Sequence, residues 1–295
     1  MSQPQFHKTR IAPTPSGFLH LGNALSFALT AAIAERSGAK ILLRIDDLDR
    51  ERVNREYVQD IFDTLNFLQI HWHEGPRNYE DYERDWSQTH RLDLYNEALK
   101  QLRDKGKVFA CSCSRAAIKR ASTDDSYPGT CLHKSIDLDA PDSSWRLITE
   151  ADAKVDIRTY PEDIIETRLP ANMRYFVVRK KDDYPAYQLS SIIDDLHFGV
   201  DLIVRGQDLW ASTIAQEYLA QQMGLDAFGQ ITFYHHPLLM ETGGLKLSKS
   251  AGSTSIKYLR DHGHSAMDVY GMIGRMAGIQ REVKDWQELG KALLE

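Results

Sequence analysis

Residues 10–23 of the chain read RIAPTPSGFLHLGN. Proline fixes φ and disfavours helix for the residue before it, so this stretch predicts an extended loop after a first strand at Lys8–Ala12. From Ala24 onward, apolar residues cover nearly every face of a helix, which predicts burial against a sheet. His20 and Asn23 lie on its first turn, where the helix dipole and the first amides favour an anion.

The same alternation of strand and helix continues along the chain. The predicted strands are Lys40–Ile45, Asp201–Arg205 and Ile231–His235, and the predicted helices are 54–68, 85–106, 187–193 and 208–223. This order predicts an α/β fold with a Rossmann-type, doubly wound parallel sheet. Asp46, Asp47 and Asp49 follow the second strand, where carboxylates either meet a ligand or cap the next helix.

A loop-rich insertion interrupts this rhythm, with short strand-like pieces at 145–148 and 175–179. Three further helices are predicted near the end of the chain. The predicted domains are 1–107 and 184–257 as the two halves of the catalytic core, 108–183 as the insertion, and 258–295 as a short helical C-terminal region.

Composition narrows the class of protein. The chain has 295 residues, a net charge of -6 and 42% hydrophobic residues. It has no apolar run of the roughly 20 residues that span a bilayer, and no basic-then-apolar signal, so the expected location is cytoplasmic with no membrane partner. An RNA partner would need a local basic patch, because the overall charge is negative.

Three cysteines, Cys111, Cys113 and Cys131, fall within one window of the insertion. An odd number of cysteines without an export signal argues against a disulfide framework. Clustered thiolates predict zinc, and His133 is the fourth ligand that residue chemistry alone favours. Free buried thiols are the alternative.

A second loop, Glu241–Ser250, combines two glycines with two lysines, which by itself is typical of a solvated surface loop. Together with residues 10–23, however, it resembles the paired signature motifs of class I aminoacyl-tRNA synthetases, most closely the glutamyl branch. The segments Arg44–Asp47, Pro185–Tyr187 and Val204–Gly206 also resemble that family in order and distance. The resemblance covers about residues 6–255.

The segment after the lysine loop is too short for the anticodon-binding domain of a full-length glutamyl-tRNA synthetase. The resemblance therefore points to the truncated paralogues, the glutamyl-queuosine tRNA(Asp) synthetases. They activate glutamate with ATP and transfer it to queuosine in the anticodon loop of tRNA(Asp). Another acceptor, such as a tRNA 3′ end or a carrier, and an inactive tRNA-binding protein are the alternatives.

The resemblance assigns roles residue by residue. It implies that His20 and Lys249 are catalytic, and that Mg²⁺ arrives with ATP. The implied ATP-binding residues are His20, Gly22, Asn23, Lys246, Ser248 and Lys249, and the implied glutamate-binding residues are Arg10, Thr14, Asp46, Tyr187 and Arg205. Asp46 replaces the usual Glu, Thr14 the usual Ser, and Asn23 a frequent His.

By the same resemblance the structural zinc is held by Cys111, Cys113, Tyr127 and Cys131, so that a tyrosine oxygen takes the place that residue chemistry gives to His133. Basic residues that are candidates for RNA contact are Lys119, Arg120, Lys134, Arg179, Lys180 and Lys181. A monomer is the family expectation.

Overall fold

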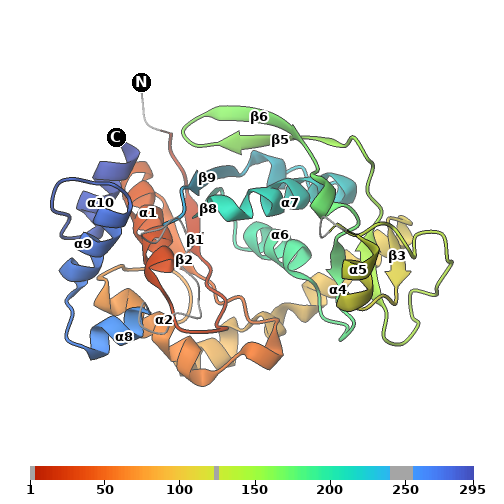
Figure 1. Cartoon of the computed structure of the whole chain (residues 1–295), viewed down its shortest axis with the longest axis horizontal. Coiled ribbons are helices and arrows are strands. Elements are labelled where there is room, and N and C mark those ends of the chain that lie inside the picture. The colour runs from red at the N-terminus through yellow and green to blue at the C-terminus, as the bar shows by residue number, and fades with distance from the viewer. Residues whose placement is uncertain (1–3, 123–125, 240–254) are drawn as a thin grey trace. The chain divides into compact units, whose positions relative to one another are not determined.

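The computed structural model describes residues 4–122, 126–239 and 255–295 (Figure 1). The chain forms two compact units. The first unit comprises Met1–His90, Val200–Gln207 and Tyr234–Glu295, and the second comprises Arg91–Gly199 and Asp208–Phe233. Each unit therefore contains segments that are far apart in the sequence.

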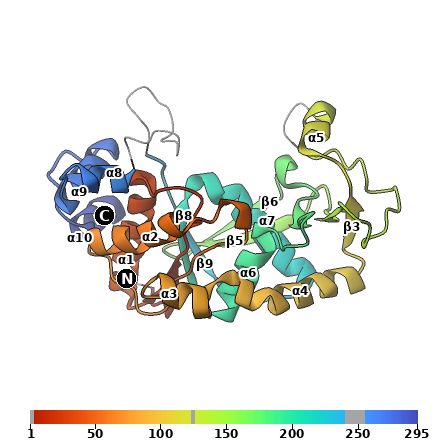
Figure 2. The ribbon, with the colours of Figure 1, turned by 90° about the horizontal axis from the view of Figure 1, so that it is seen from below.

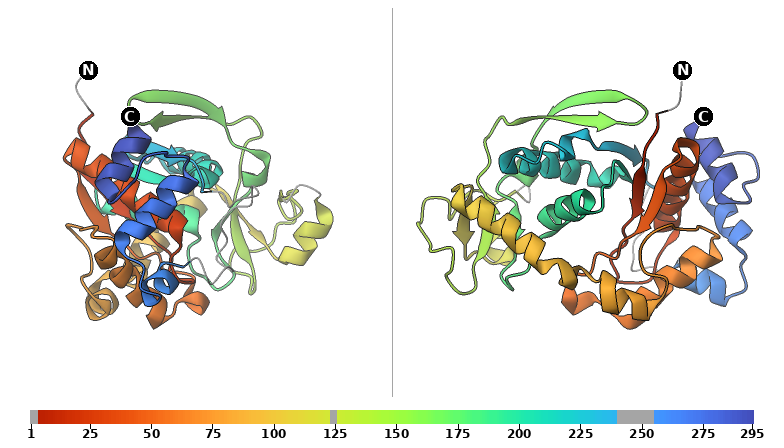
Figure 3. Two further views of the ribbon diagram at one scale, coloured as in Figure 1. Left: turned by 60° about the vertical axis from the view of Figure 1, so that its left-hand side comes forward. Right: turned by 180° about the vertical axis from the view of Figure 1, so that it is seen from behind.

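The first unit is built on parallel strands. β1 (Lys8–Ile11) pairs in parallel with β2 (Lys40–Leu43) on one side and with β8 (Leu202–Gly206) on the other. α1 (Leu21–Ser37) runs beside these strands, as Figure 3 shows. Parallel neighbours joined by a helix confirm the predicted α/β fold, and all three strands end at the same edge of the sheet.

The described residues of the first unit form further α-helices. They are α2 (Arg55–Phe67), α3 (Tyr79–Asp81), α8 (Ile256–Asp261), α9 (Ala266–Met276) and α10 (Trp286–Leu294). Figure 2 shows α8, α9 and α10 grouped with α1 and α2. The closest approach is at Gly290, where an added Cβ would lie 2.2 Å from the Cβ of Ala32. Glycine at this position lets α10 pack directly on the buried face of α1.

The second unit contains an antiparallel sheet of order β3-β4-β7, which is Val108–Cys111, Ser144–Leu147 and Val177–Arg179. A hairpin of β5 (Lys154–Thr159) and β6 (Asp163–Arg168) adds a second set of strands. The first residues of β9 (Thr232–His236) pair in parallel with β5. The helices of this unit are α4 (Leu92–Asp104), α5 (Arg115–Ala121), α6 (Tyr187–His197) and α7 (Trp210–Met223).

Two expectations from the sequence were incomplete. The insertion is richer in structure than its loop-like sequence indicates, because it also contains β3, α5 and the β5–β6 hairpin. Most of β6 is exposed, so its residues do not show the alternation that reveals a half-buried strand. The helix predicted over 85–106 begins only at Leu92, after a π-helical turn at Tyr82–Trp86 and a 3-10 turn at Gln88–Arg91.

None of the helices in the described part of the chain combines the length and the hydropathy that a bilayer-spanning helix requires.

Candidate active site and metal site

Two buried arginines lie on adjacent parallel strands of the first unit. Arg10 on β1 is 6% exposed and Arg205 on β8 is 4% exposed. The guanidinium of Arg10 donates from Nη1 to the carbonyl of Val204, 3.4 Å away. Both arginines stand near the carboxyl ends of their strands, the edge at which α/β sheets bind ligands. Two buried guanidinium groups therefore lie on neighbouring strands at this edge.

Asp46 follows β2 at the same edge and is held by Arg44. The guanidinium of Arg44 donates to both carboxylate oxygens, at 2.7 Å from Nε and 3.1 Å from Nη2. Both side chains are buried. The amide of Asp46 also donates to the carbonyl of Pro13, 3.0 Å away, which ties this segment to the loop that carries the exposed Thr14. The orientation of the Asp46 carboxylate is thus set by Arg44.

His20 is the N-cap of α1. Its Nδ1 accepts the amide of Gly22 at 3.1 Å, while its own amide donates to the side chain of Asn23 at 3.0 Å. A ring nitrogen that accepts carries no proton, so the neutral ring has its proton on Nε2. This arrangement gives His20 an N–H donor on the edge of the ring opposite the capped amide.

Gly22 leaves room for the ring of His20. A Cβ at Gly22 would lie 3.0 Å from Cε1 and 3.1 Å from Nδ1 of that imidazole. The side chain of Asn23 completes the capping box of α1. The resemblance assigns this same residue to ATP binding. The sequence motif is therefore also a helix-capping motif.

The chain returns to this helix start after the lysine loop. Ser255 forms an antiparallel bridge with His20, and the amide of Ile256 donates to the carbonyl of Leu19 at 2.7 Å. Ser255 comes a few residues after Lys249 in the sequence. Lys246, Ser248 and Lys249 themselves lie outside the described residues.

Tyr187 belongs to the second unit, at the first position of α6, and is 40% exposed. The helix behind it is anchored by Asp194, which accepts two bonds from the guanidinium of Arg91 and one from the hydroxyl of Tyr95. Asp194 is fully buried. Its network fixes α6 within its unit and so fixes the backbone that carries Tyr187.

Asp47 is a buried carboxylate that the sequence did not single out from its neighbours. It is 0% exposed and accepts from the hydroxyls of Tyr82 and Ser87 and from Arg50, each at 2.6 Å. The amide of Gln88 adds a fourth bond at 2.9 Å. Burial and the adjacent carboxylate raise the pKa of Tyr82. Asp47 thus holds the 82–88 segment against the strand end that carries Asp46.

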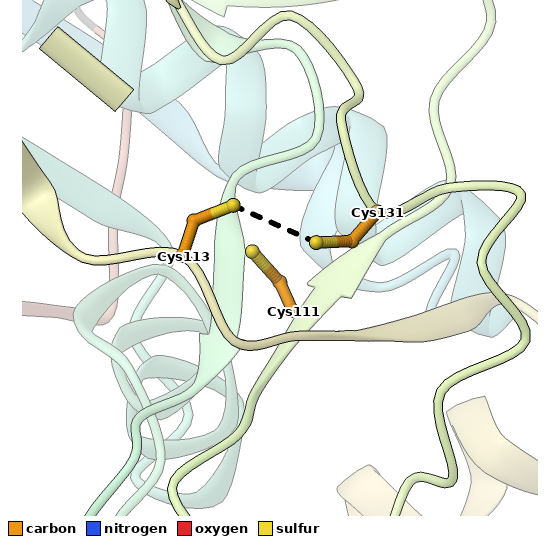
Figure 4. Close-up of side chains that lie close together, drawn as sticks. All are labelled: Cys111, Cys113 and Cys131. Atoms are coloured by element: carbon orange, nitrogen blue, oxygen red, sulfur yellow. Dashed lines mark hydrogen bonds between the residues drawn. The ribbon is translucent and has the colours of Figure 1, made fainter. Parts of the chain in front are cut away.

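The three cysteines of the second unit meet as predicted. The sulfur atoms of Cys111, Cys113 and Cys131 all lie within 4.8 Å of one another, and Figure 4 shows the side chains converging. Cys111 lies at the end of β3, and the other two lie on the loops that follow. Three sulfurs at this spacing could hold a metal ion, and three thiolates with one further ligand are a donor set that suits tetrahedral zinc.

Tyr127 supplies an oxygen at the same place. Its hydroxyl lies 3.3 Å from Sγ of Cys111 and accepts the amide of Cys131 at 2.9 Å. The guanidinium of Arg146 lies over its ring, 3.8 Å from the centroid. His133, the ligand that residue chemistry favoured, is exposed. The described structure brings Tyr127 to the three sulfurs.

The thiols have unequal proton affinities. Burial, and then the contact with Cys131, raise the pKa of Cys113 to about 11. Burial also acts to raise the pKa of Cys131, but hydrogen bonds from Tyr127, Cys113 and the amide of Ser112 outweigh it and lower this pKa to about 7. The thiolate is the form that binds metal, and the lowered pKa of Cys131 favours that form near neutral pH.

A family model described as "tRNA synthetases class I (E and Q), catalytic domain" matches residues 7–289. The chain belongs to this family. A glutamyl-Q tRNA(Asp) synthetase of Symbiobacterium thermophilum is 34% identical to it over 92% of the chain and 86% of that protein. A glutamate-tRNA ligase of an Anaeromyxobacter strain is 31% identical over 87% of the chain. The chain spans only 54% of that ligase.

Solved structures of the same family share the fold. A glutamate-tRNA ligase from Elizabethkingia meningosepticum, solved with its amino acid, superposes with a TM-score of 0.76 at 20% identity. The superposition covers 98% of this chain and 64% of that one. A second synthetase, from Elizabethkingia anophelis, gives a TM-score of 0.77. At this identity the likeness establishes the class I synthetase fold.

Proposed function

We propose that this protein activates L-glutamate with ATP and transfers the glutamyl group to queuosine in the anticodon loop of tRNA(Asp). The observation that carries the proposal is the strand edge of the first unit, where buried Arg10 and Arg205 lie on neighbouring strands. The start of α1, capped by His20, belongs to the same unit. The 34% identical relative bears the name of that activity.

Activation joins a carboxylate oxygen of glutamate to the α-phosphorus of ATP and releases pyrophosphate. Arg10 and Arg205 would bind the carboxylates of glutamate through charge-assisted hydrogen bonds. The Nε2–H of His20 would donate to a phosphate oxygen as negative charge moves toward the leaving pyrophosphate. Lys249 would add positive charge, and Mg²⁺ would arrive with the nucleotide. The protein then acts by positioning and preorganised charge.

Asp46 is proposed to receive the ammonium group of glutamate, with Thr14 and Tyr187 adding hydroxyl contacts. Because Arg44 binds both oxygens of Asp46, the ammonium would approach a carboxylate that is already oriented. Arg44 also leaves that carboxylate with less net negative charge. Arg44 would therefore help to set how tightly the amino group is bound.

The rest of the proposed ATP site follows from the resemblance. Gly22 and Asn23 lie at the start of α1, and Lys246 and Ser248 belong to the lysine loop. The first amides of a helix favour phosphate, which supports the placement of the nucleotide at this end of α1.

The cysteine cluster is proposed to hold a structural zinc through Cys111, Cys113, Tyr127 and Cys131. The donor set fits, since three sulfurs and one oxygen converge on one place. Zinc would cross-link β3 to the loops that follow it and stabilise a part of the insertion with few regular elements. No step of glutamate activation is assigned to it.

Two alternatives are tested together with the proposal. Pyrophosphate exchange between ATP and glutamate, measured without tRNA, separates an active enzyme from an inactive tRNA-binding protein. Transfer of labelled glutamate to tRNA(Asp) with queuosine, but not to the same tRNA without it, separates queuosine from any other acceptor. The proposal predicts exchange and queuosine-dependent transfer by a monomer. Transfer to a tRNA 3′ end would refute the assigned acceptor.

A further inference from the structure

A cavity of about 560 Å³ lies in the first unit, among the turn after α2 and the starts of α9 and α10. Its size is within the range of small-ligand sites. None of its residues belongs to the strand edge or to the start of α1. The residues that line it include Gln69, Met267, Tyr270, Lys284, Trp286 and Gln287.

Two aromatic residues of the cavity are fixed by their polar edges. The indole N–H of Trp286 donates to the carbonyl of Gln69 at 3.2 Å. The hydroxyl of Tyr270 donates to the carbonyl of Leu68 at 2.7 Å. Because the N–H of Trp286 is held by the backbone, a ligand in the cavity would meet the carbon atoms of this half-buried ring system. Trp286 is thus an aromatic surface of fixed orientation.

The polar groups around this face are of mixed type. Gln69 and Gln287 are exposed amides, and each can both donate and accept. Lys284, next to Trp286, is an exposed cation at the rim, with the carboxylate of Glu282 3.9 Å from its ammonium group. Asp285 caps α10 by accepting the amide of Glu288 at 2.8 Å. An aromatic face beside amides that donate and accept, with a cation close by, matches a nucleobase and its phosphate.

We propose that this cavity binds one unpaired nucleotide of the RNA substrate, with its base stacked on Trp286 and its phosphate near Lys284. The proposal rests on the proposed function only in taking RNA as the substrate. It adds a contact within the first unit that is independent of the basic residues of the insertion. Met267, 47% exposed, lines the same cavity and provides a position for testing it without disturbing the core.

The test measures binding of a fluorescein-labelled tRNA(Asp) transcript to the full-length protein by anisotropy, without ATP or glutamate. Trp286→Leu is expected to weaken binding about tenfold, because a stacked base is lost. Trp286→Phe, which keeps an aromatic face, is expected to retain most of the affinity. Thermal unfolding of each variant checks that α10 remains folded.

A second pair of variants controls for folding and for charge. Met267→Glu places a carboxylate at the cavity and should also weaken binding. Ile164→Glu adds the same charge to the exposed β6 strand, where Ile164 is 59% exposed, and should leave binding unchanged. Ultraviolet cross-linking followed by mass spectrometry should place an RNA adduct on the peptide that contains Trp286.

Three results would overturn the proposal. They are equal RNA affinity of Trp286→Leu and the wild type, equal affinity of Met267→Glu and Ile164→Glu, and cross-links confined to other peptides. Loss of self-association in Met267→Glu would assign the cavity to a second copy of the chain instead. Failure of pyrophosphate exchange would refute the proposed function and leave these binding results standing.

Discussion

Replacing Asp47 by Asn should destabilise the first unit strongly. The Asp47 carboxylate is fully buried and accepts four hydrogen bonds, from Tyr82, Ser87, Gln88 and Arg50. Arg50, Tyr82 and Ser87 bond Oδ2, and the amide of Gln88 bonds Oδ1, so an asparagine that keeps its oxygen at Oδ2 faces the Gln88 amide with an N–H₂ group. The bond lost at Gln88 costs about 1.5–3 kcal/mol, and the loss of charge weakens the other three by roughly 0.5–1 kcal/mol each, which gives about 3–6 kcal/mol in total.

Urea denaturation followed by circular dichroism measures this loss, and thermal unfolding should show a midpoint lower by about 6–12 °C. Asp49→Asn is the matched control, because Asp49 is half-exposed and its bond to Arg52 is long, at 3.4 Å. That variant should change stability by less than about 1 kcal/mol. If Asp47→Asn and Asp49→Asn were equally stable, the reasoning from the buried network would be wrong.

Four other predictions follow from single contacts. Arg44→Lys cannot make the two-pronged bond to Asp46, so the KM for glutamate in pyrophosphate exchange should rise about tenfold, and the unfolding midpoint should fall by roughly 3–6 °C because one bond of a buried pair is lost. Gly22→Ala should lower the kcat of exchange, because the new methyl group would lie 3.0 Å from Cε1 of His20 and push the ring out of position. An unchanged kcat would contradict this. Tyr127→Phe should reduce the zinc retained against a chelator, measured by atomic emission, whereas His133→Ala should not. Burial raises the pKa of Glu217 from 4.5 to about 7, so between these pH values the folded protein keeps a proton that the unfolded chain has lost. The free energy of unfolding should therefore fall as the pH rises from about 4.5 through 7. Glu217→Gln should flatten that dependence in urea titrations at pH 5 to 8.

Much of the candidate site was predictable, because its residues follow one another along the chain. His20, Gly22 and Asn23 form a local capping arrangement, and the sequence places them at the start of one helix. Cys111 ends β3, Cys113 follows two residues later, and Cys131 lies in the same loop-rich segment, so their clustering was expected and is observed. Local spacing fixes such arrangements because few residues separate the partners.

The alternatives that the sequence left open depended on which side chains the fold brings together in three dimensions. Whether Tyr127 or His133 faces the sulfurs depends on how a loop returns to β3, and the structure brings the Tyr127 hydroxyl there and leaves His133 exposed. Asp46 and Asp47 looked alike as neighbouring carboxylates. The structure separates them, because Asp46 is bonded at both oxygens by Arg44, whereas Asp47 accepts hydrogen bonds from Tyr82, Ser87 and Gln88.

The sequence by itself determined the alternation of strands and helices, an apolar helix with His20 and Asn23 on its first turn, the cysteine cluster and the likeness to class I synthetases. These features depend on hydrophobic periodicity and on residues that are close along the chain, so local sequence patterns are enough to predict them. Tertiary structure alone decided that Arg10 and Arg205, far apart in sequence, share one sheet edge, and that Trp286 meets Gln69 beside a cavity. The physical reason is that strand order and helix packing arise from burial summed over the whole core, which no short segment encodes.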